Sequence, residues 1–406
     1  MKVSPKKRIY LDFASTTPCD PKVLKAMLPF LGGSFANPAS LYLEGVEMKK
    51  KIKDARKVCA DILFAHQDEI IFTGSGTESN NLAILGIHTR LVEEGVKKLH
   101  YVTSTIEHAS VLEVFKELER RGASVTYVAP NEMGIINPSE IKKALLPHTA
   151  LVSIMYSNNE IGTIQDIREI AKVVRHFRKT KVRPFPSQSS SSRSDLGLPF
   201  LHTDASQSAN YLNLNVEQLG VDLMTLDGSK IYGPKGVGML YKKRRVFISP
   251  IIFGGGQEQG LRSGTENVAG IIGFTTALSM VQSDKAKESK RLVVLRDWLI
   301  KNILATFPES ILNGHKVERL PNNVNICFPN LDAEFAVLQL DARGISCSSV
   351  TSCKNLTLDS SSYVIEAIRQ KREENCAKSS LRISLGRSTS KQDLTVLLKA
   401  LKEVMK

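Results

Sequence analysis

The sequence predicts an α/β protein: a large domain built on a mostly parallel sheet with helices on both faces, followed by a smaller α+β domain. Helical patterns alternate with short apolar strands from residue 40 to about 280, and this alternation is typical of parallel sheets. After residue 280 the pattern gives way to a long charged helix and a different order of strands and helices. The 406 residues also exceed the roughly 100–200 of a single domain, which favours two domains.

The large domain is expected at 15–280. Its first clear element is a helix at 41–63, in which Val46, Ile52 and Ile62 fall near the 3.6-residue spacing of an amphipathic helix. Short apolar runs then predict strands, and periodic segments predict the helices between them. In chain order we expect a strand at 69–72, a helix at 78–87, a strand at 100–102, a helix at 108–121, a strand at 125–129, a helix at 139–146, a strand at 151–155, a helix at 167–178, and strands at 221–224 and 237–240.

The smaller domain is expected at 281–406, with residues 1–14 packing on it. Its elements are a charged helix at 284–304, a strand at 324–326, a helix at 333–343, a strand at 381–384 and a closing helix at 391–404. Before it, the segment 179–198 is rich in Ser, Arg and Pro, a composition that predicts an exposed, mobile loop.

Composition and the chain start favour a cytoplasmic location with no membrane association. Hydrophobic residues make up 42% and charged residues 24%, both in the ordinary globular range. No apolar run reaches the roughly 18 residues of a membrane span. The basic segment 1–8 leads directly into the strand-like 9–12 and lacks the apolar stretch of a secretory signal.

Cysteine spacing indicates the redox state of the compartment, and net charge indicates the kind of partner. The six cysteines are scattered with no CxxC pair, which suits a reducing compartment and argues against a disulfide framework or a structural zinc site. We expect no metal. The formal charge of +14 favours acidic partners, such as phosphate compounds, RNA or an acidic carrier protein, or serves solubility alone.

A glycine-rich turn at 72–78 (FTGSGTE) is the first candidate binding element. It joins an expected strand to an expected helix, so its small residues lie at a helix N-terminus. Unpaired N–H groups and the helix dipole favour an anion such as phosphate there. Alone, such a turn is weak support for a phosphate site.

Asp204 and Lys230 supply the chemistry that the turn lacks. Asp204 follows a short apolar run, at the strand end where ligands gather in open α/β sheets. Its carboxylate can keep a pyridine nitrogen protonated or can cap a helix. Lys230 follows the strand-like 221–226 in a Gly- and Pro-rich turn, and desolvation there would make the amine nucleophilic toward an aldehyde. Phosphate cradle, acid and lysine together predict a site for pyridoxal 5′-phosphate (PLP).

With these residues in place, the chain resembles the cysteine desulfurases of the NifS/IscS type, which are PLP-dependent enzymes of fold type I in the class V aminotransferase group. The resemblance runs over nearly the whole length. It is carried by the segments 9–12, 16–18, 37–40, 76–79, 107–108, 158–163, 204–207, 230–238, 254–258 and 262–267.

The resemblance implies roles around the cofactor. Lys230 would carry PLP as a Schiff base, and Gly76, Thr77 and Ser229 would bind its phosphate. Asp204 would pair with the ring nitrogen. These assignments place the cofactor at the strand ends identified above.

Further roles concern the ring, the substrate and a second subunit. His108 would stack on the pyridine ring and move protons, while Asn159 and Gln207 would contact the ring hydroxyl. Arg382, with Asn159, would bind the substrate, its planar fork clamping the carboxylate. Thr265 would reach the phosphate of a neighbouring subunit, which implies a homodimer.

The sulfur-accepting cysteine has two candidates. Desulfurases use a mobile cysteine thiolate as the nucleophile. Alignment from Ile345 puts Thr351 at the family's cysteine position, whereas alignment from 362–363 brings Cys353 close to it. We prefer Cys353, beside Lys354, over Cys347; two inert buried thiols are the alternative.

Several positions depart from the family pattern. Asp227 and Ser229 stand where the family has Ser-Gly-His before the lysine. Like charges about 4 Å apart cost near 1 kcal/mol even in water, so Asp227 is expected either to turn away, toward a Lys or Arg, or to weaken cofactor binding. Phe13 and Tyr42 replace a usual asparagine and histidine, and 179–198 is an extra insertion.

The leading hypothesis is desulfuration of L-cysteine. Alanine leaves, and the enzyme persulfide passes its sulfur to an acceptor protein of iron–sulfur cluster assembly or tRNA thiolation. The sequence does not distinguish L-cysteine from L-selenocysteine as the substrate. The alternatives are a related lyase or aminotransferase without a persulfide step, and a degenerate, non-catalytic homologue that serves as a binding scaffold.

Overall fold

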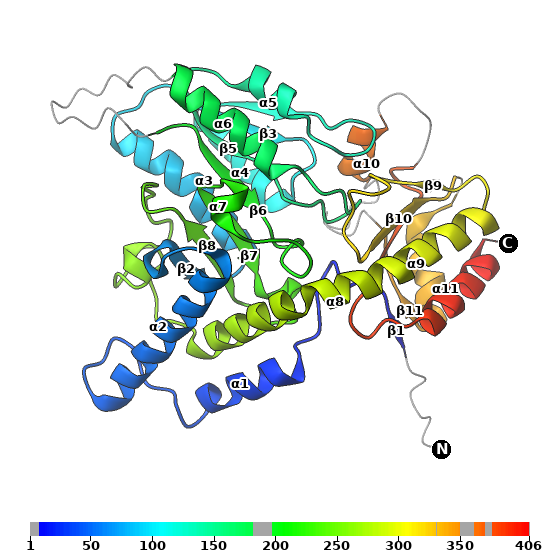
Figure 1. The fold of residues 1–406 in the computed structure, drawn as a ribbon, viewed down its shortest axis with the longest axis horizontal. Helices are drawn as coiled ribbons and strands as arrows, with labels where there is room; N and C mark the ends of the chain where they lie inside the picture. Colours follow the sequence, from blue (N-terminus) through cyan, green and yellow to red (C-terminus); the bar gives the residue numbers. More distant parts are fainter. Residues whose placement is uncertain (1–7, 182–196, 330, 350–360, 370–375, 406) are drawn as a thin grey trace.

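The computed structural model describes residues 8–181, 197–329, 331–349, 361–369 and 376–405. Within these ranges the chain forms a seven-stranded sheet covered by helices, a four-stranded sheet, and one long helix that extends from the first sheet to the second (Figure 1). Most of the Ser-rich segment predicted as a loop, residues 182–196, lies outside the described residues.

The larger sheet has the strand order β2-β8-β7-β6-β5-β3-β4. All of its pairs are parallel except those of β8, which runs antiparallel to both of its neighbours. The prediction of an α/β fold with a mostly parallel sheet is confirmed. The strands are β2 (Ile70–Thr73), β3 (His100–Ser104), β4 (Ser124–Val128), β5 (Thr149–Ser153), β6 (Phe200–Asp204), β7 (Leu223–Asp227) and β8 (Gly238–Lys242).

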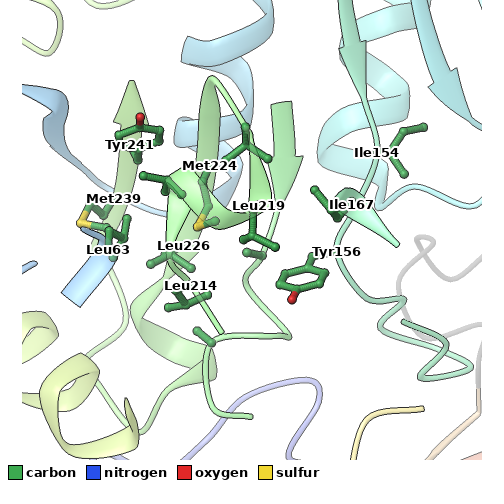
Figure 2. Close-up of a cluster of buried hydrophobic side chains, with 14 of the residues drawn as sticks. Leu63, Ile154, Tyr156, Ile167, Leu214, Leu219, Met224, Leu226, Met239 and Tyr241 are labelled. Carbon is green, nitrogen blue, oxygen red and sulfur yellow. The ribbon is translucent and has the colours of Figure 1, made fainter. Parts of the chain in front are cut away.

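Helices cover both faces of this sheet, as the alternation of buried side chains along its strands requires. In β7, Leu223 joins the apolar cluster beneath α3 and α4, whereas Met224 and Leu226 join the cluster on the opposite face. Figure 2 shows the second cluster, where Leu226 lies near Met239 of β8 and Leu63 of α2. The helices are α1 (Pro21–Leu31), α2 (Leu43–Leu63), α3 (Gly76–Glu93), α4 (Ala109–Arg120), α5 (Pro138–Ala144), α6 (Ile167–Lys181) and α7 (Val216–Leu219).

The smaller sheet is antiparallel, in the order β12-β13-β10-β9. The start of the described chain joins this part, because β1 (Ile9–Tyr10) pairs in parallel with β11 (Ile345–Ser346). The remaining elements are β9 (Ile311–Leu312), β10 (Asn323–Cys327), α9 (Ala333–Ala342), β12 (Ser348–Ser349), α10 (Tyr363–Ile368), β13 (Ser380–Ser384) and α11 (Lys391–Val404).

Helix α8 (Val268–Thr306) connects the two parts as one unbroken helix of 39 residues. Phe274 and Val281 in its first half belong to the core of the larger sheet, whereas Leu292 and Ile303 belong to the core of the smaller one. The sequence predicted only the charged half, at 284–304. The first half is apolar on several sides and lacks the polar stripe that marks an amphipathic helix. The domain boundary expected at 280 therefore falls inside α8.

One disulfide joins Cys327 to Cys376, a pairing that the scattered cysteine spacing did not predict. Cys327 ends β10 and stands opposite Ser380 of the antiparallel β13, which brings the chain just before β13 close to it. A sequence separation of 49 residues hides this proximity. Within the described ranges, no helix combines the length and apolarity needed to span a membrane.

Asp222, just before β7, joins the strands and helices that carry the site. Its carboxylate accepts hydrogen bonds from the Leu201 N–H (2.9 Å) and from the guanidinium groups of Arg178 and Arg245 (both 2.5 Å). The side chain is only 3% exposed, so the two arginines balance a charge that water does not reach. Removing that charge leaves the largely buried Arg178 and the partly exposed Arg245 without the carboxylate that they share.

We expect Asp222→Asn to lower the free energy of unfolding by about 3 kcal/mol, because one partner of a buried ion pair is lost. Urea denaturation would measure it. Glu217→Gln is the matched control: Glu217 is 63% exposed and pairs with Lys243, so its loss should change the free energy by less than about 1 kcal/mol. Equal effects of the two substitutions would contradict this account of Asp222.

Candidate active site

A pocket of about 490 Å³, partly open to solvent, lies at the carboxyl ends of β6 and β7 and at the N-terminus of α3. The pocket gathers most of the residues predicted from separate parts of the sequence. It is lined by Gly76, Thr77, His108, Ser110, Met155, Ser157, Asn159, Asp204, Ser206, Gln207, Asp227 and Lys230.

Lys230 enters the pocket from the 3₁₀ turn η2 (Gly228–Lys230) that follows β7. Its ammonium group donates a hydrogen bond to the main-chain oxygen of Ser15. The N-terminal segment in turn holds η2, because the Thr17 N–H donates to the main-chain oxygen of Ser229 over 2.8 Å. The amine therefore projects from a turn that is fixed on two sides.

Asp204 ends β6 and is held rigidly by donors to both carboxylate oxygens. Asn80 donates its side-chain N–H to Oδ2 over 2.8 Å, and the Ser206 main-chain N–H donates to Oδ1 over 2.9 Å. Asp204 pairs in register with Thr225 of β7, so it reaches the same sheet edge as Lys230. A carboxylate held in this way can keep a basic ring nitrogen protonated.

His108 lines the pocket at the N-cap of α4. The Ser110 main-chain N–H donates to its Nδ1 over 3.1 Å, so the proton of the neutral ring lies on Nε2. Burial lowers the pKa of His108 below its usual value, and the nearby carboxylate of Asp204 opposes that shift. The imidazole is therefore a neutral base at pH 7.

Glu107, beside His108, is buried and not part of the pocket lining. Burial raises the pKa of its carboxyl group to about 8, although hydrogen bonds from Ser104 and from the Met155 N–H oppose the shift. It ties the end of β3 to the segment after β5. It supports the two lining residues His108 and Met155 from behind, and sequence reasoning gave it no role.

Asp227 occupies the N-terminus of α3. Its Oδ2 accepts the Gly76 N–H over 2.8 Å, and its Oδ1 accepts the N–H (2.7 Å) and the hydroxyl (2.5 Å) of Ser229. The expectation that Asp227 turns toward a Lys or Arg is wrong, since its hydrogen-bond partners are the helix end and its own turn. A Cβ on Gly76 would come within 3.1 Å of Asp227 and 3.3 Å of the Ser206 hydroxyl, so a larger residue here would press on both side chains.

Ser229, Thr265 and Arg382 do not line the pocket. The Ser229 hydroxyl donates to Asp227. Arg382 is buried on β13 and donates to the Asp12 carboxylate (2.9 Å) and the Ser15 hydroxyl (2.6 Å). Ser15 thus contacts both Arg382 and the pocket lysine, and sequence reasoning gave it no role.

Of the two candidate cysteines, Cys347 lies among the described residues and Cys353 does not. Cys353 lies in 350–360, outside the described residues. Cys347 is 7% exposed, and burial, together with the nearby Asp12 carboxylate, raises the pKa of its thiol to about 12. A thiol with that pKa supplies almost no thiolate at pH 7, which argues against Cys347 as a nucleophile.

Sequence reasoning missed Ser110, Met155, Ser157 and Ser206 among the lining residues. Ser206 could have been found, because it lies two positions after Asp204 at the same strand end. The others carry no signal of their own. They reach the pocket because β3 and β5 end at the same sheet edge as β6.

Comparison with known proteins identifies the class of enzyme. The family model for class V aminotransferases matches residues 9–183 and 198–397, and the chain belongs to this family. Cysteine desulfurase IscS of Dictyoglomus turgidum is 40% identical over 98% of this chain and 95% of its own length. Cysteine desulfurase IscS 1 of Archaeoglobus fulgidus is 38% identical over 98% and 96%. Within the class V group, the chain is a member of the cysteine desulfurase family.

A solved structure supports the same placement. The structure titled NIFS-LIKE PROTEIN superposes with a TM-score of 0.86 at 30% identity, covering 98% of this chain and 99% of that one. The family resemblance inferred from the sequence motifs is confirmed by the family model, the relatives and this structure.

The pocket fits PLP, the cofactor of this family, at all but one point. Lys230 and Asp204 lie in one pocket, and Asn159 has a buried Oδ1 with no partner among the described residues, which leaves it free to bond a ligand. The α3 N-terminus and Ser206 offer donors to a phosphate. The exception is Asp227, a carboxylate at the phosphate end.

We expect the pKa of His108 in the cofactor-free protein to lie below 6.5 and to fall further in Asp204→Asn. Asp204 is the carboxylate that favours the charged imidazole, so its loss leaves burial less opposed. NMR titration of histidine-labelled protein, assigned with His108→Gln, measures both values. Asp68→Asn, at an exposed carboxylate paired with Arg244, is the control and should leave the His108 titration unchanged. A rise in Asp204→Asn would contradict the stated balance.

Proposed function

We propose that this chain, a cysteine desulfurase, removes the sulfur of L-cysteine with PLP held on Lys230, giving L-alanine and a persulfide on its own cysteine. The observation that carries the proposal is the meeting of Lys230, Asp204, His108 and the α3 N-terminus in one pocket, in a chain that belongs to the cysteine desulfurase family. PLP chemistry accounts for these four groups without a hydrolytic triad and without a metal cluster.

Six of the lining residues would hold the cofactor. Lys230 would bind its aldehyde carbon and Asp204 its ring nitrogen, while Asn159 and Gln207 would contact the ring hydroxyl. Thr77 and the Gly76 end of α3 would face the phosphate. When bound, PLP supplies an electron sink for charge that develops on the substrate α-carbon.

Proton transfer falls to two side chains of the pocket. His108 is neutral at pH 7 because burial lowers its pKa, so the ring can accept a proton in the pocket. The Lys230 amine would be the other candidate base whenever it is not holding the cofactor. Either group would remove the proton from the substrate α-carbon, and the same group can return one to the product.

Arg382 would bind the substrate carboxylate. Its Nη1 donates to the main-chain oxygen of Asn159 over 3.2 Å, which places the guanidinium beside a lining residue. Its Nε is buried and has no partner in the described part of the chain. A carboxylate that accepts two parallel N–H bonds would use this free donor.

Sulfur transfer requires a thiolate on a cysteine of this chain, and we propose Cys353. Its sulfur attacks the sulfur of the bound substrate, the substrate C–S bond breaks, and an S–S bond forms. L-Cysteine and the enzyme thiol thus give L-alanine and the enzyme persulfide, with no external oxidant or reductant. The persulfide sulfur then passes to an acceptor protein of iron–sulfur cluster assembly or tRNA thiolation.

A homodimer would complete the site. Exposed apolar side chains gather in and around α1 and α2, and Thr265 does not line the pocket of its own chain. We propose that a second copy covers this surface and that Thr265 of each protomer reaches the cofactor phosphate of the other. The exposed side chains are Leu24, Leu28, Leu31, Phe35, Leu41, Tyr42, Leu43 and Val46.

Purified protein supplied with PLP should show the yellow absorption band of a lysine-bound cofactor, and Lys230→Ala should abolish the band. Within the described part of the chain, Lys230 is the one lysine that lines the pocket. Lys235→Ala is the matched control, since Lys235 is an exposed lysine in the same turn, and the band should persist. A wild-type protein that remains colourless with excess PLP would favour the non-catalytic scaffold instead.

Sulfide release from L-cysteine should fall by at least about 10³-fold in Cys353→Ser, whose hydroxyl is a far weaker nucleophile, while the cofactor band remains. Cys347→Ser should retain most of the activity, because burial already suppresses the thiolate of Cys347. Sulfide and alanine assays with L-cysteine and a reductant measure both. Undiminished release from Cys353→Ser would refute this role and favour a lyase or aminotransferase without a persulfide step.

A further inference from the structure

The phosphate end of the pocket already contains an anion. The first N–H of α3, from Gly76, donates to the Asp227 carboxylate over 2.8 Å. Helix N-termini bind phosphate through such N–H groups, and α3 is an 18-residue helix with a full dipole. The Asp227 side chain therefore takes up a donor that a phosphate would use.

Asp227 is fixed in this position by its second oxygen. Oδ1 accepts both the N–H and the hydroxyl of Ser229, and so caps the turn that presents Lys230. The Asp227 Cβ also lies within 3.1 Å of where a Cβ on Gly76 would stand, which shows how tightly strand and helix approach. Rotating Asp227 out of the pocket would break the cap of the lysine turn.

The charges around this end do not neutralise the carboxylate. Lys230 is the sole Lys or Arg among the residues that line the pocket, and its amine donates to Ser15. Arg262, the nearest arginine at the start of α3, pairs instead with Glu78 over 3.0 Å. Among the described lining residues, Lys230 is thus the one cation that could offset the repulsion between a dianionic phosphate and this carboxylate.

Neutral donors remain for a phosphate. The Thr77 N–H makes no hydrogen bond within the described residues, because the N–H groups of the first helical turn have no acceptor inside the helix. The Ser206 hydroxyl lies at the same end, 3.3 Å from the position of a Cβ on Gly76. The phosphate end can therefore hold PLP, but with fewer donors and an opposing charge.

We infer that Asp227 acts as a built-in anion that reduces the contribution of the phosphate to cofactor binding. The site then discriminates PLP from phosphate-free pyridoxal far less than an anion site without a carboxylate would, and it releases PLP more readily. Asp227 is a specificity-determining residue for the cofactor. This inference rests on the proposed function, because it assumes that Lys230 condenses with the aldehyde of either compound.

The test compares binding of the two aldehydes to cofactor-stripped protein by absorption titration at pH 8, where the phosphate, with a second pKa near 6, is dianionic. Asp227→Asn keeps the size of the side chain and removes its charge. We expect it to bind PLP about tenfold more tightly than the wild type, and pyridoxal within about threefold of it. Far-UV circular dichroism and thermal melting verify folding, and Asp227→Ser serves as a second variant.

Glu78→Gln is the matched control. Glu78 lies in the same first turn of α3 but faces the Gly74 N–H and Arg262, outside the pocket lining. Its loss should leave the ratio of PLP to pyridoxal affinity unchanged. An equal rise in that ratio for both variants would assign the effect to general charge near the helix and overturn the inference.

Different results would contradict the proposed function and the role of Asp227. If neither aldehyde forms an adduct with wild type or variant, the proposed function fails. If both aldehydes bind at Lys230 and the affinity ratio is the same in wild type, Asp227→Asn and Asp227→Ser, the function stands and the role of Asp227 falls. A ratio that rises in both Asp227 variants, and not in Glu78→Gln, supports the inference.

Discussion

The parallel pairing of β6 with β7 is the constraint on which the site depends. It brings the carboxyl ends of both strands to one edge of the sheet, with Asp204 level with Thr225, so that an acid and the following lysine turn face one pocket. The Asp227 hydrogen bond to Gly76 then fixes the start of α3 against the same edge. Rigid elements thus hold a carboxylate and an amine at positions that a loop could not maintain.

Most of the fold and much of the pocket follow from local sequence patterns. Asp204 and Lys230 were identifiable because each follows an apolar strand, and carboxyl strand ends converge in a parallel sheet. The first half of α8 was missed because its buried surface is apolar on several sides, with no amphipathic stripe. The Cys327–Cys376 bond was missed because it depends on antiparallel pairing between distant segments.

The position of Asp227 shows where sequence reasoning reaches its limit. The sequence predicts a conflict between this carboxylate and a phosphate, but its orientation depends on how closely β7 approaches α3. The two approach so closely that a Cβ at position 76 would stand 3.1 Å from Asp227. The acid therefore reaches the helix end, and it also caps the lysine turn. One side chain therefore stabilises the site and opposes part of its ligand. The stabilising effect is not visible from spacing alone.

The central claim is that the Lys230 amine is the group that condenses with the cofactor aldehyde. Borohydride reduction of the PLP-treated protein, followed by proteolysis and mass spectrometry of the peptides, tests it most directly. The account predicts a pyridoxyl-phosphate adduct on the peptide that contains Lys230. An adduct confined to other lysines, or none at all, would contradict it.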